Sequence, residues 1–593
     1  MTTGTAALSW AALRDLRCAE LESAADGWGR VGNRADAARD RIDKHLLNGL
    51  RETQQGAAAE SAAARLRRLN RNFQYVHTEC GLIRTTLNSL AHEMKAQQRA
   101  LMLALEDAAA LKFTVQADGS VSYPAAGEGM IDGRPLQGGT TTSNGLPDLV
   151  PPSGLAAPNP NVAKAQDIAD RVVGAVRAAA EIDWRYAGIL RRLKAEEGLA
   201  VPTSTWKDAA SDAADVRDAA RTYLRDAIPR TASPAERNAW WAGLTQEQRE
   251  EYLAVYPDVI GNLDGIPAAV RDAANRDNLQ LLIGTLAGRD DADSVAKLAG
   301  LREIDRQLQA GTDPPMFLLG IGEEGNGRAI VSYGDPDTAR NVAAYVPGLN
   351  TSLDKEFAEG DLKRAWDTAK GAQKYDHSSA VMVWLGYDAP QFPDGWSSAD
   401  VMGDERAKVG GQAFGSFMDG LGVTNMNDDP HLTAIGHSYG SRTVGAAAQD
   451  RGGVPGVDEI VFVGSPGVGV DRADELGVGK GHVFVGAAQN DVVTKVPSRL
   501  QGGLTAAAGP VGYAIGGLLD REKDDLWFGK DPASSAFGAR RFHADDGPHL
   551  ISGSFAAHSQ YFDAQPQRSN GSADSIAMIV AGCSDAVKLE ELR

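Results

Sequence analysis

The apolar residues of the N-terminal region recur at steps of three and four. One such stripe runs from Leu21 to Ile42, and a longer one runs from Leu66 to Ala104. Steps of this size place apolar side chains on one face of a helix. A glycine-containing break separates the stripes, and a bend centred on Gly49 would fold them onto each other. Residues 1–120 are therefore predicted to form a long antiparallel helical hairpin.

The pattern then changes twice. Gly, Pro, Ser and Thr dominate residues 121–161, which predicts a flexible linker because such a composition buries little apolar surface. Helical periodicity returns over residues 162–310, the expected lead-in region. Capping-box patterns at Ser233 and Thr245 predict the starts of two short helices within it.

Short apolar runs separated by helical segments fill residues 311–593. Residues 316–320 and 328–333 read as an edge hairpin, and buried strands are predicted at 342–346, 380–385, 432–435, 459–463 and 482–485. Continuous apolar runs of this kind are typical of parallel strands covered on both faces by helices. Ligands of such sheets bind beyond the carboxyl ends of the strands.

A candidate nucleophile lies at the end of one predicted strand. Residues 436–440, Gly-His-Ser-Tyr-Gly, stand between the run 432–435 and a helix-favouring segment, which is the strand, turn and helix order that G-x-S-x-G requires. The glycines are needed because side chains beside the sharp turn would collide with the strand and the helix. Ser438 is therefore the predicted nucleophile, and an ordinary turn with an incidental serine is the alternative.

A serine hydroxyl needs a base to take its proton and a carboxylate to orient that base. Asp491 follows the second predicted strand after Ser438 and is the favoured acid, with Asp471 and Asp474 as rivals. The histidines that follow Asp491 are His543, His549 and His558. Spacing favours His558 only weakly over His549.

An oxyanion hole needs two backbone N–H donors. The residue after the nucleophile, Tyr439, supplies the first. The strand 342–346 is followed by Pro347 and Gly348, so Leu349 or Asn350 is the candidate for the second. A plain Pro-Gly turn without catalytic role is the alternative reading.

Five segments together resemble an actinobacterial alpha/beta-hydrolase family of uncharacterised function, whose catalytic fold is similar to that of cutinases and lipases. These segments are Tyr345–Leu353, Trp384–Pro390, Gly436–Gly440, Gln489–Asp491 and His558–Tyr561. The resemblance spans roughly residues 230–590. It implies an alpha/beta hydrolase fold after a long all-helical region, and it implies that Asp491 and His558 complete a triad with Ser438. It implies no substrate.

The segment between the expected acid and base is long. Residues 499–548 are a candidate lid, since residues 504–519 form an apolar stretch of the kind that covers an acyl pocket, and a purely structural insert is the alternative. No cluster of potential metal ligands has the spacing of a metal site, so we expect neither metal nor cofactor.

Composition limits the partners. The formal net charge of −19 argues against nucleic acid and against anionic membrane surfaces. No apolar run reaches the length of a membrane span, and the N-terminus lacks the pattern of a Sec signal, so a soluble, cytoplasmic chain is expected. Three cysteines exclude a disulfide scaffold. The Gly49 bend would place Cys18 level with Cys80, either facing each other or as two separate buried thiols.

The N-terminal hairpin resembles the WXG-type helical hairpins linked to type VII secretion, although Asn48-Gly49 stands where Trp-x-Gly would be. It indicates either export without a Sec signal or a helical partner or self-association through residues 1–120. The sequence thus predicts a serine hydrolase that cleaves a small or lipid-like ester. The alternative is a secretion-associated or interaction protein whose hydrolase fold has little or no turnover.

Overall fold

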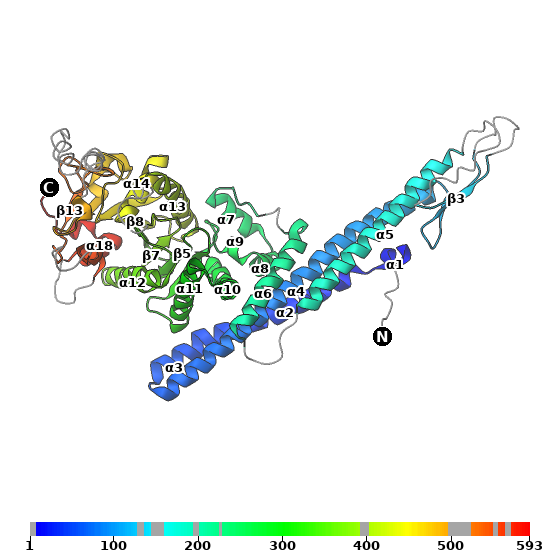
Figure 1. Ribbon diagram of the computed structural model, residues 1–593, viewed down its shortest axis with the longest axis horizontal. Helices are drawn as coiled ribbons and strands as arrows, with labels where there is room; N and C mark the ends of the chain where they lie inside the picture. The colour runs from blue at the N-terminus through cyan, green and yellow to red at the C-terminus, as the bar shows by residue number, and fades with distance from the viewer. Residues whose placement is uncertain are drawn as a thin grey trace. The chain divides into compact units, whose positions relative to one another are not determined.

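The chain folds into two compact units. The computed structural model describes residues 8–126, 136–143, 159–193, 201–224, 228–391, 403–495, 524–548, 556–563 and 571–593. One unit comprises residues 1–201 and 211–228 and is mainly helical, and the other comprises residues 202–210 and 229–593 and contains a large β-sheet. Figure 1 shows both units with their helices and strands labelled.

The helical unit is built on α4 (Ala57–Ala110), a helix of 54 residues. The antiparallel helix α2 (Cys18–Arg41) packs along it, as an ion pair of 2.6 Å between Lys95 and Glu22 indicates. The remaining helical elements before α4 are α1 (Trp10–Asp15), the π-helix η1 (Ile42–Leu47) and α3 (Asn48–Thr53). The apolar stripes therefore form a helical hairpin, and Figure 1 shows its two arms side by side.

The hairpin turns at a different residue from the one predicted. The chain stays helical through Gly49, which lies inside α3, and it reverses at Gln54–Gly56. Gly56 has a φ of 92° and a ψ of 178°, a conformation that essentially only glycine adopts. The bend centred on Gly49 is therefore wrong, because a single glycine is tolerated within a helix whereas this positive φ is not tolerated by other residues.

The shifted turn also separates the two cysteines. Cys18 lies level with Gln98, whose side-chain oxygen accepts a hydrogen bond of 3.4 Å from its thiol. Cys80 instead lies against Gly32 on the opposite arm. Both thiols are free and buried, and burial raises the pKa of Cys80 to about 11. The idea that Cys18 faces Cys80 is therefore wrong.

A third helix completes this unit. α5 (Asn161–Arg192) packs against α4, with the hydroxyl of Tyr186 donating to Glu93 at 2.7 Å. Its buried face includes Ile168 and Val172. The predicted lead-in region therefore starts too early at residue 162, because the apolar face of α5 is buried within the same unit as the hairpin, and that unit extends to residue 201. The unit ends with the C-terminal half of α6 (Thr203–Ala219) and η2 (Ala220–Thr222).

Two segments of the predicted flexible linker belong to a small antiparallel sheet. They are β2 (Val121–Tyr123) and β3 (Gly139–Thr141), and the third strand, β1 (Thr114–Val115), precedes the linker. The rings of Tyr123 and Phe113 lie 6.3 Å apart, and Val121 is fully buried. These few apolar side chains suffice to order the strands, so a flexible linker is wrong for these residues. Residues 127–135 and 144–158 of that linker lie outside the described residues.

The second unit begins with helices that lead to the sheet. They are α7 (Pro234–Gly243), α8 (Gln246–Val255), α9 (Pro257–Ile260), α10 (Ala268–Leu286) and α11 (Ala292–Ala310). Ser233 and Thr245 form complete capping boxes with Glu236 and Gln248, which confirms the predicted helix starts.

The large sheet of eight strands is mostly parallel and has the order β13-β10-β9-β8-β6-β7-β5-β4. The strands are β4 (Met316–Gly322), β5 (Arg328–Tyr333), β6 (Asn341–Val346), β7 (Ser379–Leu385), β8 (His431–His437), β9 (Val457–Val463), β10 (Val483–Gly486) and β13 (Arg540–Phe542). The first two form the expected antiparallel hairpin at one edge, and all others are parallel. β13 was not predicted, since its three residues include two arginines.

Helices cover both faces of this sheet, which confirms the predicted alpha/beta hydrolase fold (Figure 1). One face packs against α13 (Glu405–Thr424) and α14 (Tyr439–Arg451), and the other packs against α10, α11, α12 (Lys355–Ala372) and α18 (Ser572–Val580). Side chains alternate between these two cores along β6: Val342 faces one core and Ala343 faces the other. Among the described helices, none combines the length and the apolar character needed to cross a membrane.

Candidate active site

The sharp turn between β8 and α14 places Ser438 at the carboxyl edge of the sheet. Ser438 has a φ of 56° and a ψ of −129°, and its N–H donates to the carbonyl of Val463 at 3.0 Å. A methyl group at Gly436 would lie 2.6 Å from Ser441 Cα, and one at Gly440 would lie 2.1 Å from the carbonyl oxygen of Val346. Both glycines are therefore required by the close approach of backbone at a strained serine.

The predicted acid and base lie together. Asp491 follows β10, and His558 lies in the short helix α17 (Ala556–Ser559). His558 Nδ1 donates to Asp491 Oδ2 at 2.9 Å, which leaves Nε2 as the nitrogen able to act as a base. The Asp491 side chain is fully buried, and 12% of the His558 side chain is exposed. Of the three pairs in the expected triad, this one is hydrogen-bonded.

Ser438 and His558 line the same cavity, but no hydrogen bond joins them among the described contacts. A nucleophile and its base are often further apart in a free enzyme than in the substrate complex. The structure therefore brings all three residues to one site, but without a hydrogen bond between Ser438 and His558 among the described contacts.

Several groups hold Asp491 in place. The hydroxyl of Tyr561 donates to Asp491 Oδ2 at 2.7 Å and accepts from the N–H of Ala488 at 3.0 Å, and the N–H of Val493 donates to Oδ1 at 2.9 Å. Burial alone would raise the pKa of Asp491, but the hydrogen bond and charge of His558, together with the other donors, lower that pKa below its ordinary value. Asp491 is therefore ionised and fixed in orientation. Tyr561 thus supports the candidate acid, a contact that sequence reasoning did not assign to it although it ends the segment His558–Tyr561.

His437, the residue before the nucleophile, supports His558. The two rings stack with their centroids 4.7 Å apart, and His437 Nε2 donates to the backbone carbonyl of His558 at 2.9 Å. Burial, followed by the charges of His558 and Arg364, lowers the pKa of His437 well below its ordinary value. His437 is therefore a neutral packing residue, and it packs specifically against the candidate base.

The loop after β6 lies beside the nucleophile because β6 and β8 are neighbouring strands. A methyl group at Gly348 would lie 2.5 Å from Ser438 Cβ, so only glycine permits this approach. The N–H of Asn350 donates to the carbonyl of Pro390 at 2.9 Å. This N–H is therefore already bonded and is not the candidate donor to an oxyanion. Among the described contacts, the N–H groups of Leu349 and Tyr439 have no acceptor. Leu349 therefore remains the candidate for the second donor.

A cavity of about 410 Å³ opens at Ser438. Trp527 and Phe528 line it from the turn between β11 (Asp525–Leu526) and β12 (Gly529–Lys530). This turn falls within the range of the predicted lid, whereas residues 504–519 lie outside the described residues. Arg364 and Asp361 line the cavity from α12. Sequence reasoning missed these four residues because none of them belongs to a recognisable motif.

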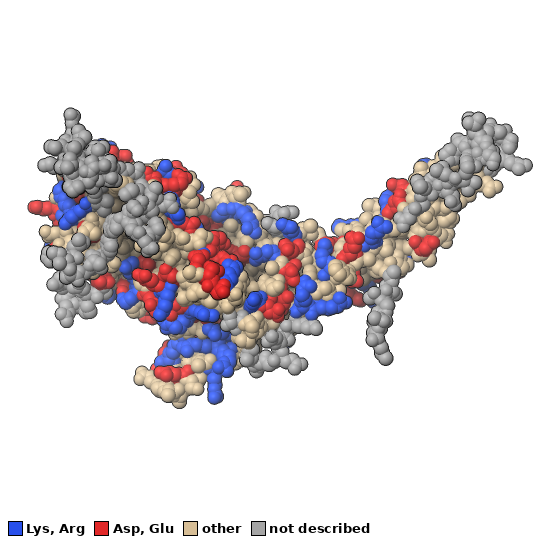
Figure 2. All heavy atoms as spheres, in the orientation of Figure 1, with Lys and Arg blue, Asp and Glu red and all other residues tan. Residues whose placement is uncertain are grey.

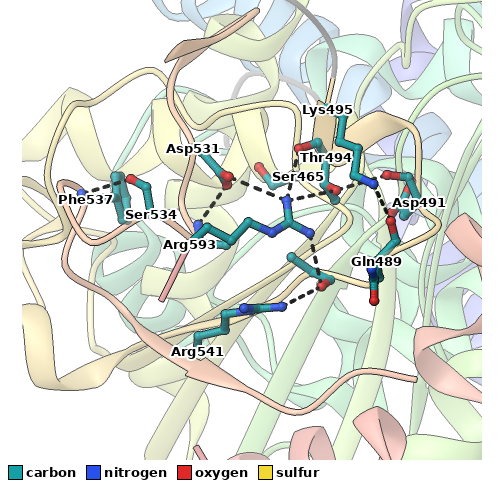
Figure 3. Close-up of polar contacts among 12 residues, drawn as sticks. Ser465, Gln489, Asp491, Thr494, Lys495, Asp531, Ser534, Phe537, Arg541 and Arg593 are labelled. Atoms are coloured by element: carbon teal, nitrogen blue, oxygen red, sulfur yellow. Dashed lines mark hydrogen bonds and ion pairs between the residues drawn. The ribbon is translucent and has the colours of Figure 1, made fainter. Parts of the chain in front are cut away.

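The loop that carries Asp491 is anchored by Arg593 (Figure 3). The Arg593 guanidinium donates to the carbonyls of Ala487 and Thr494 at 3.3 Å and forms an ion pair of 3.5 Å with Asp531. These contacts fix both ends of the turn around Asp491. Arg593, although remote in sequence, therefore helps to position Asp491.

The rival residues lie elsewhere. Asp474 is exposed and pairs with Arg472 at 2.9 Å, and Asp471 is also exposed. His543 contacts Glu590, and His549 lies outside the described residues. Within the described part of the chain, no group of three or more His, Cys, Asp or Glu side chains is placed to hold a metal ion.

Comparison with known proteins agrees with the fold. Residues 323–501 match a family described as alpha/beta hydrolase. An uncharacterised protein of Mycobacterium tuberculosis (strain H37Rv) is 30% identical over 398 residues, which cover 60% of this chain and 57% of that protein. The chain thus spans little more than half the length of that relative. An uncharacterised protein of Mycobacterium bovis (strain AF2122/97) is 35% identical over 205 residues, which cover 33% of this chain and 74% of that protein. The chain therefore belongs to the alpha/beta hydrolase family.

Proposed function

We propose that the chain is a serine hydrolase that cleaves an ester or a related acyl bond through an acyl-enzyme. The observation that supports this most is the position of Ser438, at a positive-φ turn in the wall of a cavity that it shares with His558, whose imidazole is held by Asp491. Membership of the alpha/beta hydrolase family supports hydrolase activity in general.

In the first half of the reaction, Ser438 Oγ bonds to the substrate carbonyl carbon while His558 Nε2 takes the hydroxyl proton. The N–H groups of Leu349 and Tyr439 donate to the oxygen that becomes negative. His558 then gives the proton to the leaving oxygen, the carbon–oxygen bond breaks, and the alcohol departs. For this transfer, Ser438 Oγ and His558 Nε2 come within hydrogen-bond reach of each other in the substrate complex.

In the second half, water attacks the acyl-enzyme. His558 takes a proton from the water, the oxyanion again forms beside Leu349 and Tyr439, and the proton passes to Ser438 Oγ as the acid is released. Asp491 remains ionised throughout and stabilises the imidazolium, a role that suits its lowered pKa. Hydrolysis thus consumes one ester and one water and yields one acid and one alcohol.

A fluorophosphonate probe tests the nucleophile directly. The native chain should be labelled at Ser438 and should hydrolyse nitrophenyl esters of graded acyl length, whereas Ser438→Ala should remain folded and do neither. The matched control is Ser441→Ala, which removes a buried hydroxyl of α14 that bonds the carbonyl of Gly436 and lies outside the cavity lining. Absence of labelling and turnover in the folded native chain would contradict the proposal.

A second function is favoured by the helical unit, which forms a compact unit of its own. Residues 34–71, around the hairpin turn, contain nine Lys and Arg against five Asp and Glu in a chain of net charge −19. Figure 2 shows Lys and Arg side chains gathered near the part of the hairpin that Figure 1 labels α3. A secretion-associated or interaction protein with little turnover would use this end to bind an acidic partner. Export that depends on type VII machinery would support that function. Efficient ester turnover by the purified chain would contradict the idea that the hydrolase fold has little turnover.

A further inference from the structure

The cavity at Ser438 is lined by apolar and by polar side chains. The apolar ones are Leu349, Phe357, Pro466, Val493, Trp527 and Phe528. The polar ones, here called the polar wall, come mainly from the loop after β6 and from α12, and they are Asn350, Ser352, Asp354, Asp361, Arg364 and Ser559. A substrate that fills this cavity therefore meets both apolar and hydrogen-bonding surface.

The polar wall offers adjacent donors and acceptors. Arg364 Nη1 donates to Asp361 Oδ1 at 2.7 Å, and the hydroxyl of Tyr345 donates to the same oxygen at 2.8 Å. Among the described contacts, Asp361 Oδ2 and the Nε and Nη2 groups of Arg364 have no partner. Bonds to Asp361 Oδ1 thus hold the pair together. Asp361 Oδ2 remains available as an acceptor, and Nε and Nη2 of Arg364 remain available as donors. A hydroxyl group, which both donates and accepts, satisfies such a pair.

The charges of the lining disfavour an anionic ligand. Apart from histidine, Arg364 is the one cationic side chain among the described lining residues, against the carboxylates of Asp354, Glu356 and Asp361. Asp354 caps α12 by accepting from the N–H of Phe357 at 2.9 Å. The cavity therefore carries more negative than positive charge, which opposes a phosphate or a free carboxylate on the substrate.

The Arg364–Asp361 pair is linked to the candidate base through Tyr345. The hydroxyl of Tyr345 contacts both side chains, and its ring centroid lies 6.4 Å from that of His437, which stacks on His558, and 4.8 Å from that of Phe562, in the segment that carries His558. The leaving oxygen must reach His558 Nε2 to be protonated, so the alcohol part lies here. The acyl part then faces Phe528, whose backbone is fixed by bonds to Pro466 and Gly469 at 3.0 and 2.7 Å.

We infer that the substrate is an ester of an apolar acyl group with a neutral polyol, whose hydroxyl groups bind between Arg364 and Asp361. This inference rests on the proposed function and adds to it the chemical class of the alcohol. Arg364 is then a specificity residue: it lowers the barrier for polyol esters by more than it lowers the barrier for simple alkyl esters.

Three butyrate esters separate the possibilities: glycerol monobutyrate, ethyl butyrate and the butyrate ester of glycolate, which is anionic. The native chain should prefer the glycerol ester to the ethyl ester in kcat/KM by about tenfold or more, as expected for hydrogen bonds to charged groups. The anionic ester should be the poorest substrate. Arg364→Met should remove the preference by lowering kcat/KM for the glycerol ester by more than that for the ethyl ester.

Two further variants control for misfolding. Arg364→Lys keeps the charge but loses the fork of donors, so it should retain part of the preference. Glu356→Gln should improve only the anionic ester. Because the preference is a ratio within each variant, a general loss of activity cancels. Equal rates for the glycerol and ethyl esters in the native chain, or equal losses for both in Arg364→Met, would overturn the inference. If the native chain hydrolyses none of the esters and fluorophosphonate leaves Ser438 unlabelled, the proposed function fails and the inference fails with it.

Discussion

The helical unit and the α/β unit hold their geometry in different ways. Along α2 and α4 the apolar stripes repeat, so many relative positions of the two helices bury similar side chains, and one glycine conformation at Gly56 decides where the chain turns. Around Ser438 each atom has a separate steric or hydrogen-bonding requirement. Periodic patterns therefore indicate the type of element, whereas short motifs with steric requirements indicate the position of individual residues.

The largest effect is expected at the acid. Asp491→Asn should preserve the fold but lower kcat by about 10⁴-fold, because an amide oriented by the donors at Tyr561 and Val493 would hold His558 in the wrong tautomer. Steady-state kinetics with a nitrophenyl ester measures this loss. Asp474→Asn is the matched control, since it alters an exposed aspartate after the neighbouring strand and should leave kcat unchanged. Equal activities of the two variants would show that Asp491 has no part in catalysis.

A single methyl group tests the oxyanion loop. Gly348→Ala would place a carbon 2.5 Å from Ser438 Cβ and displace the N–H of Leu349, so kcat/KM should fall by about 10²–10³-fold, the usual cost of losing one oxyanion donor. Gly360→Ala is the control: this glycine lies within α12, and a methyl group there meets no neighbouring atom within 4 Å. Its activity should remain native. A Gly348→Ala variant of native activity would exclude the loop from the reaction.

These two experiments mark what the sequence could predict. The strands of the sheet and the positions of Ser438, Asp491 and His558 follow from apolar runs, from one motif and from a family resemblance. Tyr561, Arg364 and Trp527 could not be found in this way, because their roles depend on which loops the strand order brings together. β13 was missed because two of its three residues, Arg540 and Arg541, are charged and only partly buried, so the strand has no apolar run. The turn at Gly56 was missed because backbone conformation is not visible in hydrophobic periodicity.

A smaller effect is expected in the pH dependence of stability. His437 stays neutral in the fold because its pKa is lowered by burial and by the charges of His558 and Arg364, partly offset by Asp491. The unfolded chain takes up a proton below pH 6.5 that the folded chain does not, so this contribution is present above pH 6.5 and is lost as the pH falls, at up to about 1.4 kcal/mol per pH unit. His437→Gln should therefore lose less stability than the native chain between pH 7 and 5.

His431 provides a control of opposite sign. Burial opposes its charge, but hydrogen bonding and attraction to Glu459 raise its pKa above 6.5. Its contribution is present below pH 6.5 and is lost as the pH rises through the raised pKa, so His431→Gln should be most destabilising at low pH. Urea unfolding of the three chains at several pH values measures both trends. Parallel pH profiles for the native chain and His437→Gln would contradict a neutral, buried imidazole.

The smallest effect tests the turn of the helical hairpin, which was predicted at Gly49 and is found at Gly56. Gly56→Ala forces a methyl group onto a φ of 92° and should lower the free energy of unfolding by about 1 kcal/mol. Gly49→Ala should raise it by about 0.5–1 kcal/mol, because Gly49 lies in α3 with no atom within 4 Å of an added methyl group. Urea unfolding of the full chain, followed by helical circular dichroism, compares the two. If Gly49→Ala were the destabilising change, the chain would reverse at Gly49 after all, and one short-range steric requirement would no longer explain how two long periodic stripes choose their pairing.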